Sequence, residues 1–234
     1  MTIQDSRKWL ETQPSEKNFL HLLDLFNNPK KENLNEFFNL LTLDVWHSLS
    51  SPEITLLFLL AKKCFKLNQL TMLNQFKANR PSDHFYEFMT AIMSTFEQKN
   101  SHRNVDIFSH LAKQDSDVEF SKLCFLFEMV AGSIENDKPT AQGFLCGAVS
   151  YFFDTYNLAY AQLIVVILID VFDNTLARDE FVEELSNHLN DDGSYGTVNP
   201  LLENRVGNLQ MKQWRVKTTF LVLAWKEVYL KNNL

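Results

Sequence analysis

The chain has 234 residues, of which 45% are hydrophobic and 22% are charged, a balance typical of folded proteins. Glycine and proline number only six each, which nearly excludes an all-β sandwich or barrel, because those folds need many tight turns. Asp and Glu total 29 against 22 for Lys and Arg, so the net charge is −7. Nucleic-acid-binding proteins usually carry a basic face, and this charge therefore argues against a nucleic-acid partner.

The three cysteines, Cys64, Cys124 and Cys146, are far apart in the sequence and lie among apolar residues. Their number and spacing indicate neither a disulfide framework nor a zinc site, and the six histidines form no metal-binding pair. Free thiols are typical of a reducing compartment. The N-terminus is polar and lacks the apolar segment of a signal peptide. We therefore expect a cytoplasmic protein that uses no metal and no cofactor.

Apolar residues recur at the three- and four-residue spacing of a helix along most of the chain. In the first half this pattern predicts a helix that ends at Asn27-Asn28-Pro29 and a second helix from Leu34 to Val45. Ser51-Pro52-Glu53 opens a third helix, with Ser51 as the N-cap and Pro52 at the first helical position. Pro81-Ser82-Asp83 opens another, and the polar stretch 98–103 is predicted to be a loop.

In the second half, Asp115-Ser116-Asp117 is predicted to cap a helix that runs to a polar break at 132–139. Further helices are predicted over 158–172, 178–189 and 209–230. The helix over 158–172 is the most apolar, but it is too short to span a bilayer.

No segment alternates polar and apolar residues as a strand does. We predict an all-α fold of about ten or eleven helices, packed as antiparallel hairpins because the loops are short. Residues 1–234 are expected to form a single helical domain, and a soft subdivision would fall near 132–139.

The loop Leu189–Pro200 is the most distinctive local feature. Its Asp192-Gly193-Ser194-Tyr195-Gly196 matches the Asp-Gly-Ser-Trp-Gly of the QW-type repeat, with Tyr195 in place of Trp and with His188 or Leu189 where Gln is usual. Residues 181–225 thus resemble one copy of this repeat, which occurs in the α/α toroids of terpene cyclases and prenyltransferases. The resemblance implies a structural role, the stapling of adjacent helix hairpins, in a toroid-like or helical-repeat-like arrangement. The DxDD motif of the protonating cyclases is absent, so no activity is implied.

Two groups of residues are candidates for a site. Asp170 and Asp173 are three residues apart on one helical face, and Asp170 follows a very apolar run, where burial would raise the pKa of a carboxyl group. They are the candidate catalytic residues. Tyr156, Tyr160 and Trp225 could line an apolar pocket, although such a stripe is more often core. The candidate ligand-binding residues are Tyr156, Tyr160, Trp225 and Tyr195.

Three functions are consistent with these observations. The first is an acidic, all-helical binding or interaction protein with a protein partner, since no catalytic motif is assembled in the sequence. The second is an enzyme or biosynthetic accessory protein that acts on an apolar, terpenoid- or lipid-like small molecule in an aromatic-lined pocket. The third is an inhibitor or immunity-type protein for a basic target, which rests on charge alone.

Overall fold

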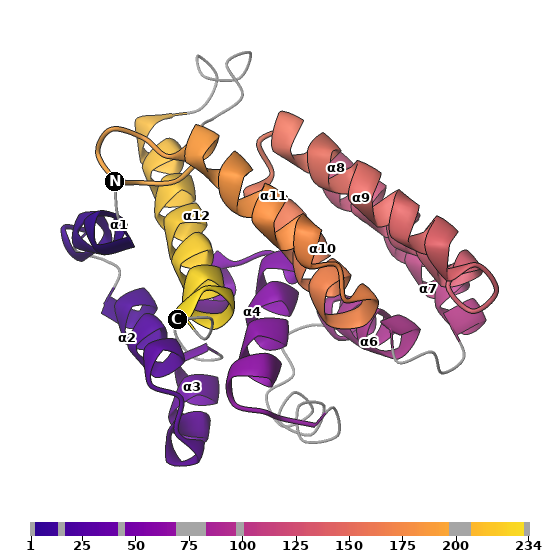
Figure 1. The fold of residues 1–234 in the computed structure, drawn as a ribbon, viewed down its shortest axis with the longest axis horizontal. Helices are drawn as coiled ribbons and strands as arrows, with labels where there is room; N and C mark the ends of the chain where they lie inside the picture. The colour runs from indigo at the N-terminus through magenta and orange to yellow at the C-terminus, as the bar shows by residue number, and fades with distance from the viewer. Residues whose placement is uncertain are drawn as a thin grey trace.

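The computed structural model describes residues 3–13, 17–41, 45–68, 83–96, 101–196 and 207–231. These residues form eleven α-helices and no strand, apart from one isolated bridge between Leu189 and Tyr195, which confirms the all-α prediction (Figure 1). The α-helices are α1 (Ile3–Glu11), α2 (Lys17–Asn27), α3 (Leu34–Leu40), α4 (Ser51–Cys64), α6 (Asp83–Phe96), α7 (Ser101–Gln114), α8 (Val118–Ser133), α9 (Lys138–Asp154), α10 (Leu158–Phe172), α11 (Thr175–Leu185) and α12 (Asn208–Tyr229). Three short 3-10 turns, η1 (Lys31–Asn33), η3 (Trp46–Ser48) and η4 (Ser186–His188), adjoin them.

Local hydrogen bonds explain where helices begin. Asp117 caps α8 as predicted, with its side chain accepting from the backbone N–H groups of residues 119 and 120. The N-cap of α4 is Ser50, not Ser51, so the prediction was wrong by one residue. The reason is that the carboxylate of Glu53 accepts from the backbone N–H of Ser50 at 2.6 Å, which requires the three-residue spacing of a capping box.

Two other predicted boundaries differ from the structure, the first because a distant residue contributes. Residues 101–103 were expected in a loop, but α7 begins at Ser101. The carboxylate of Glu135, in the turn after α8, accepts from the backbone N–H of Ser101 at 2.8 Å and also bonds its hydroxyl. These bonds satisfy a backbone donor in the first turn of α7. The helix expected over 178–189 begins at Thr175 and gives way to η4 after Leu185.

Helices that follow one another from α6 to α11 pack as sequential neighbours, and α10 also packs against α4 and α12. The C-terminal α12 lies beside α1, α2 and α4 and so joins the two ends of the chain (Figure 1). Residues 134–137 form a short turn between the packed helices α8 and α9. The expectation of a toroid or helical-repeat arrangement stays a prediction.

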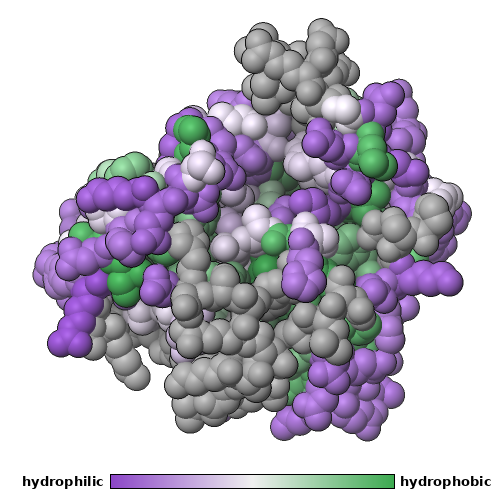
Figure 2. Space-filling view, turned by 180° about the vertical axis from the view of Figure 1, so that it is seen from behind, coloured by the Kyte–Doolittle hydropathy of each residue, from purple (hydrophilic) through white to green (hydrophobic). Residues whose placement is uncertain are grey.

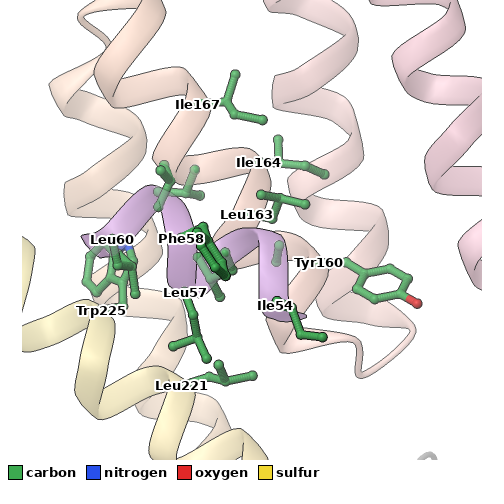
Figure 3. Packing of buried hydrophobic residues seen from close by; sticks show 14 of the residues in the cluster. Ile54, Leu57, Phe58, Leu60, Tyr160, Leu163, Ile164, Ile167, Leu221 and Trp225 are labelled. Carbon is green, nitrogen blue, oxygen red and sulfur yellow. The ribbon is translucent and has the colours of Figure 1, made fainter. Parts of the chain in front are cut away.

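Helix α10 lies at the centre of the core. All of its residues from 160 to 168 are buried. Figure 3 shows Leu163, Ile164 and Ile167 of α10 in one cluster with residues of α4 and with Leu221 and Trp225 of α12. Phenylalanine rings fill much of the remaining interior; Phe88, Phe108 and Phe127, for example, contact one another between α6, α7 and α8. No helix in the described part of the chain is long and apolar enough to cross a membrane.

Burial at the centre of α10 predicts a large stability difference between two leucines. Leu163 is 0% exposed, whereas Leu176 at the start of α11 is 64% exposed. Leu163→Ala should lower the free energy of unfolding by about 2–5 kcal/mol, because it removes buried methyl groups and leaves a cavity. Leu176→Ala should change it by less than about 0.5 kcal/mol. Urea unfolding of both variants tests this, and equal losses would contradict the central place of α10.

Candidate functional site

Asp170 lies where three helices end. Its Oδ1 pairs with Nζ of Lys63 at 2.5 Å, and its Oδ2 accepts from the hydroxyl of Tyr229 at 2.7 Å. Lys63 is in the last turn of α4 and Tyr229 is the last residue of α12. Nearer the N-terminus of α4, Glu53 pairs with Lys217, in the middle of α12, at 3.8 Å. Helices α4, α10 and α12 therefore run parallel, with their C-terminal ends together at Asp170.

The electrostatics of this junction follow from the helix ends. Three helix C-termini bring partial negative charge together, which disfavours a carboxylate and favours a cation. Lys63 supplies that cation, since its Nζ both pairs with Asp170 and lies 4.2 Å from the centre of the Tyr229 ring. Burial, and then the charge of Asp170, raise the pKa of Tyr229 well above its usual value. The Tyr229 hydroxyl thus stays protonated and donates to Asp170.

The two candidate aspartates do not form one site. Both oxygens of Asp170 are bonded within the junction. Asp173 is exposed at the C-cap of α10, in a left-handed conformation with φ 53°. Among the described residues, no group of three or more His, Cys, Asp or Glu side chains is placed to hold a metal ion.

The candidate aromatic residues are mostly packed in the interior. Trp225 is fully buried, edge-on to Phe181 at 4.8 Å and stacked on Tyr229 at 5.3 Å between ring centres. Tyr160 is buried beside Phe152, and burial raises its pKa well above the usual value. Tyr156 is half-buried, with its ring edge-on to that of His188. None of them lines any of the four grooves found along the described residues.

Tyr195 fastens the loop after η4 to α12. The ring is buried, its backbone N–H donates to Oγ1 of Thr219 at 2.8 Å, and its hydroxyl accepts from Nζ of Lys226 at 2.5 Å. The loop closes on itself through the bridge from Leu189 to Tyr195 and through the bond from the Gly196 N–H to the carbonyl of residue 188, at 2.9 Å. Tyr195 is therefore a packing residue that joins the loop to α12.

Asp192 ties the same loop to two other helices. Its Oδ1 accepts from the backbone N–H and the hydroxyl of Ser194, its Oδ2 lies 3.5 Å from Arg215 of α12, and it also bonds Trp9 of α1. Burial alone would raise the pKa of Asp192, but the bonds from Ser194 and the charge of Arg215 outweigh it and hold the pKa below its usual value. The loop thus connects α1, α11 and α12.

A groove of about 500 Å³ runs between α9, α10 and α11. Three carboxylates line it, Asp154, Glu180 and Glu184, and none of the three has a hydrogen bond or ion pair with another described residue. Between them lie apolar side chains and one thiol, from Val149, Phe153, Leu168, Leu176, Ala177, Phe181 and Cys146. Of the apolar ones, Leu176 is exposed, whereas Leu168 and Phe181 are almost fully buried. Burial, and then the charge of Glu180, raise the pKa of the Cys146 thiol.

A second groove, of about 520 Å³, lies between α4, α6 and α10. Its lining includes Lys62, Lys63 and Lys66 from the end of α4, and Asp170 at its edge. Of the sequence candidates, this groove therefore includes one, Asp170. The sequence offered a weak signal for it in the adjacent Lys62 and Lys63, but the apolar walls come from three helices that only the fold brings together.

Figure 2 shows one face of the molecule, on which apolar residues appear as small patches among hydrophilic ones. Comparisons of the chain with protein-family models, with curated proteins and with solved structures gave no match. The resemblance of residues 181–225 to the QW-type repeat therefore stays a prediction.

Replacement by alanine should affect stability differently at two glycines, Gly196 in the loop and Gly147 on α9. Gly196 has φ +96°, and a Cβ added there would lie 3.0 Å from the Trp214 ring, whereas a Cβ at Gly147 on α9 would meet nothing within 4 Å. Gly196→Ala should lower the free energy of unfolding by about 1–3 kcal/mol. Gly147→Ala should raise it by about 0.5–1 kcal/mol, because alanine is the better helix former. Thermal unfolding of the two variants tests this, and a neutral Gly196→Ala would contradict the close packing of the loop.

His188 predicts a pH dependence of stability. Its ring is buried against Phe153, and burial lowers its pKa, against an opposing effect of Glu184. The unfolded chain therefore takes up a proton at a higher pH than the folded chain does. This contribution to stability is complete above the ordinary histidine pKa, about 6.5, and is lost as the pH falls below it.

His188→Phe should consequently flatten the fall in the free energy of unfolding between about pH 7.5 and pH 5.5. His110→Gln, at an exposed position of α7, is the matched control and should keep the wild-type slope. Urea unfolding at several pH values measures both, and an unchanged slope in His188→Phe would count against the buried neutral imidazole.

Proposed function

We propose that the chain is a binding protein without catalytic chemistry of its own, and that the groove between α9, α10 and α11 binds a basic, amphipathic segment of a partner protein. The observation that carries this proposal is the combination, in one groove, of apolar walls with three carboxylates that bond no other described residue. We refer to it as the acidic groove.

The groove's chemistry favours a basic helix over other partners. Apolar side chains such as Leu176, 64% exposed at the rim, gain by burial against a partner's apolar face. Lys and Arg can lay their methylene stems along the same walls and place their charges at the carboxylates. An amphipathic helix in a groove between helices is a common mode of recognition, and the net charge of −7 would speed the approach of a basic partner.

The same residues are poorly suited to catalysis. A thiolate is the nucleophilic form of cysteine, and the raised pKa of Cys146 reduces the thiolate fraction at neutral pH. The other titratable candidate, Asp170, is outside this groove and is bonded by Lys63 and Tyr229. The geometry thus supports binding more than chemistry.

Charge removal in the acidic groove tests the proposal. A synthetic amphipathic helical peptide of Leu and Lys is the probe, and fluorescence anisotropy at low and high salt is the measurement. Glu180→Gln together with Glu184→Gln should weaken binding about tenfold at low salt and less at high salt, where charges are screened. Glu183→Gln, on the same helix but outside the groove lining, is the matched control and should weaken binding less than twofold.

Cys146 reports where the peptide binds. It is exposed in the groove, whereas Cys64 and Cys124 have pKa values raised to about 11 and about 12 by burial. Iodoacetamide should therefore modify Cys146 first, and bound peptide should slow that reaction in proportion to its occupancy. Equal loss of binding in Glu183→Gln, or no protection of Cys146, would refute the acidic groove as the site.

A further inference from the structure

The groove between α4, α6 and α10, which we call the basic groove, has a charge opposite to that of the whole molecule. Three lysines line it against one carboxylate, Asp170, in a chain of net charge −7. Lys66 is exposed and has φ 53° just after α4. Its backbone N–H donates to the carbonyl of Lys63 at 3.3 Å, but its side chain forms no hydrogen bond or ion pair with another described residue. The apolar walls beside it come from Leu59, Leu67, Ile92, Met93, Phe96, Val166, Ile167 and Val171.

We infer that the basic groove binds a long-chain fatty acid, with the acyl chain along the apolar walls and the carboxylate at Lys66, just after α4. The volume of about 520 Å³ is in the ordinary range for a small-molecule site. The walls belong to helices, whose backbone groups are bonded within each helix. An extended peptide laid there would find few backbone partners, whereas an acyl chain needs none. Charge complementarity then selects an anionic head group.

The position of the lysines has a simpler explanation, which the experiment must separate from binding. Lys62 and Lys63 lie in the last turn of α4, where cations stabilise a helix C-terminus. If that were their whole role, an alkyl chain with a neutral head group would bind as well as one with a carboxylate. A head-group comparison at constant chain length therefore decides between the two explanations.

The first measurement is isothermal titration calorimetry of the purified protein with dodecanoate and with dodecanol, each below the concentration at which it aggregates. Dodecanoate should bind about tenfold more tightly than dodecanol. Decanoate should bind more weakly than dodecanoate, because each buried methylene contributes roughly fourfold to affinity. Equal affinity for dodecanoate and dodecanol, or no binding of either, would overturn the inference.

A charge reversal then locates the head group. Lys66→Glu should weaken dodecanoate binding about tenfold and leave dodecanol binding unchanged. Lys212→Glu makes the same charge change at an exposed position of α12 outside the basic groove, and it should change dodecanoate binding less than twofold. Circular dichroism confirms that each variant is folded. Equal effects of the two variants would overturn the placement of the carboxylate at Lys66.

The two proposed sites can fail separately. Lys66→Glu should leave binding of the Leu and Lys peptide unchanged, since Lys66 does not line the acidic groove. The double variant Glu180→Gln with Glu184→Gln should likewise leave dodecanoate binding unchanged. Loss of both ligands in either variant would contradict the assignment of two sites.

Discussion

The burial of α10 is the constraint on which the fold depends. Ten of its fifteen residues are buried, and such a helix has no polar face to turn toward water, so other helices must cover it on most sides. Neighbours in sequence, α9 and α11, supply part of that cover, and α4 and α12 supply the rest from distant parts of the chain. Helices α4 and α12 therefore pack against α10 because α10 has no polar face to expose to water.

Parallel packing of α4, α10 and α12 concentrates partial negative charge where the three helices end. A carboxylate is unfavourable among helix C-termini unless it has bonding partners. Lys63 and the Tyr229 hydroxyl are the partners of Asp170, and each bonds one of its oxygens. Asp192 has a comparable role in the loop after η4. Its side-chain bonds connect this loop, which follows α11, to α1 and α12. In both places a carboxylate that stays partly exposed is bonded to residues of other helices.

The sequence predicted local structure well and the candidate site poorly. Helix ends depend on neighbouring residues, whereas the site depends on contacts between residues far apart in the chain. Helical periodicity and the proline that follows Asn28 are local signals, so the end of α2 and the span 158–172 were predicted from them. The start of α7 depends on Glu135, more than thirty residues away, and no local pattern contains that bond. Asp170 was correctly seen to follow a buried run, but its partners Lys63 and Tyr229 come from helices 107 and 59 residues away.

Charges in this chain fall into two classes according to whether the fold uses them. Asp170, Asp192 and Glu53 bond residues of other helices, so their replacement would disturb the structure before it revealed any function. Glu180, Glu184 and Lys66 have no such bonds among the described residues, and each lines a groove with apolar walls. A charge that contributes nothing to the fold but borders an apolar groove is the kind that a ligand can neutralise. Charged side chains of this kind lie at the two grooves beside α10, and not beside the buried aromatic rings, so the two grooves are the proposed binding sites.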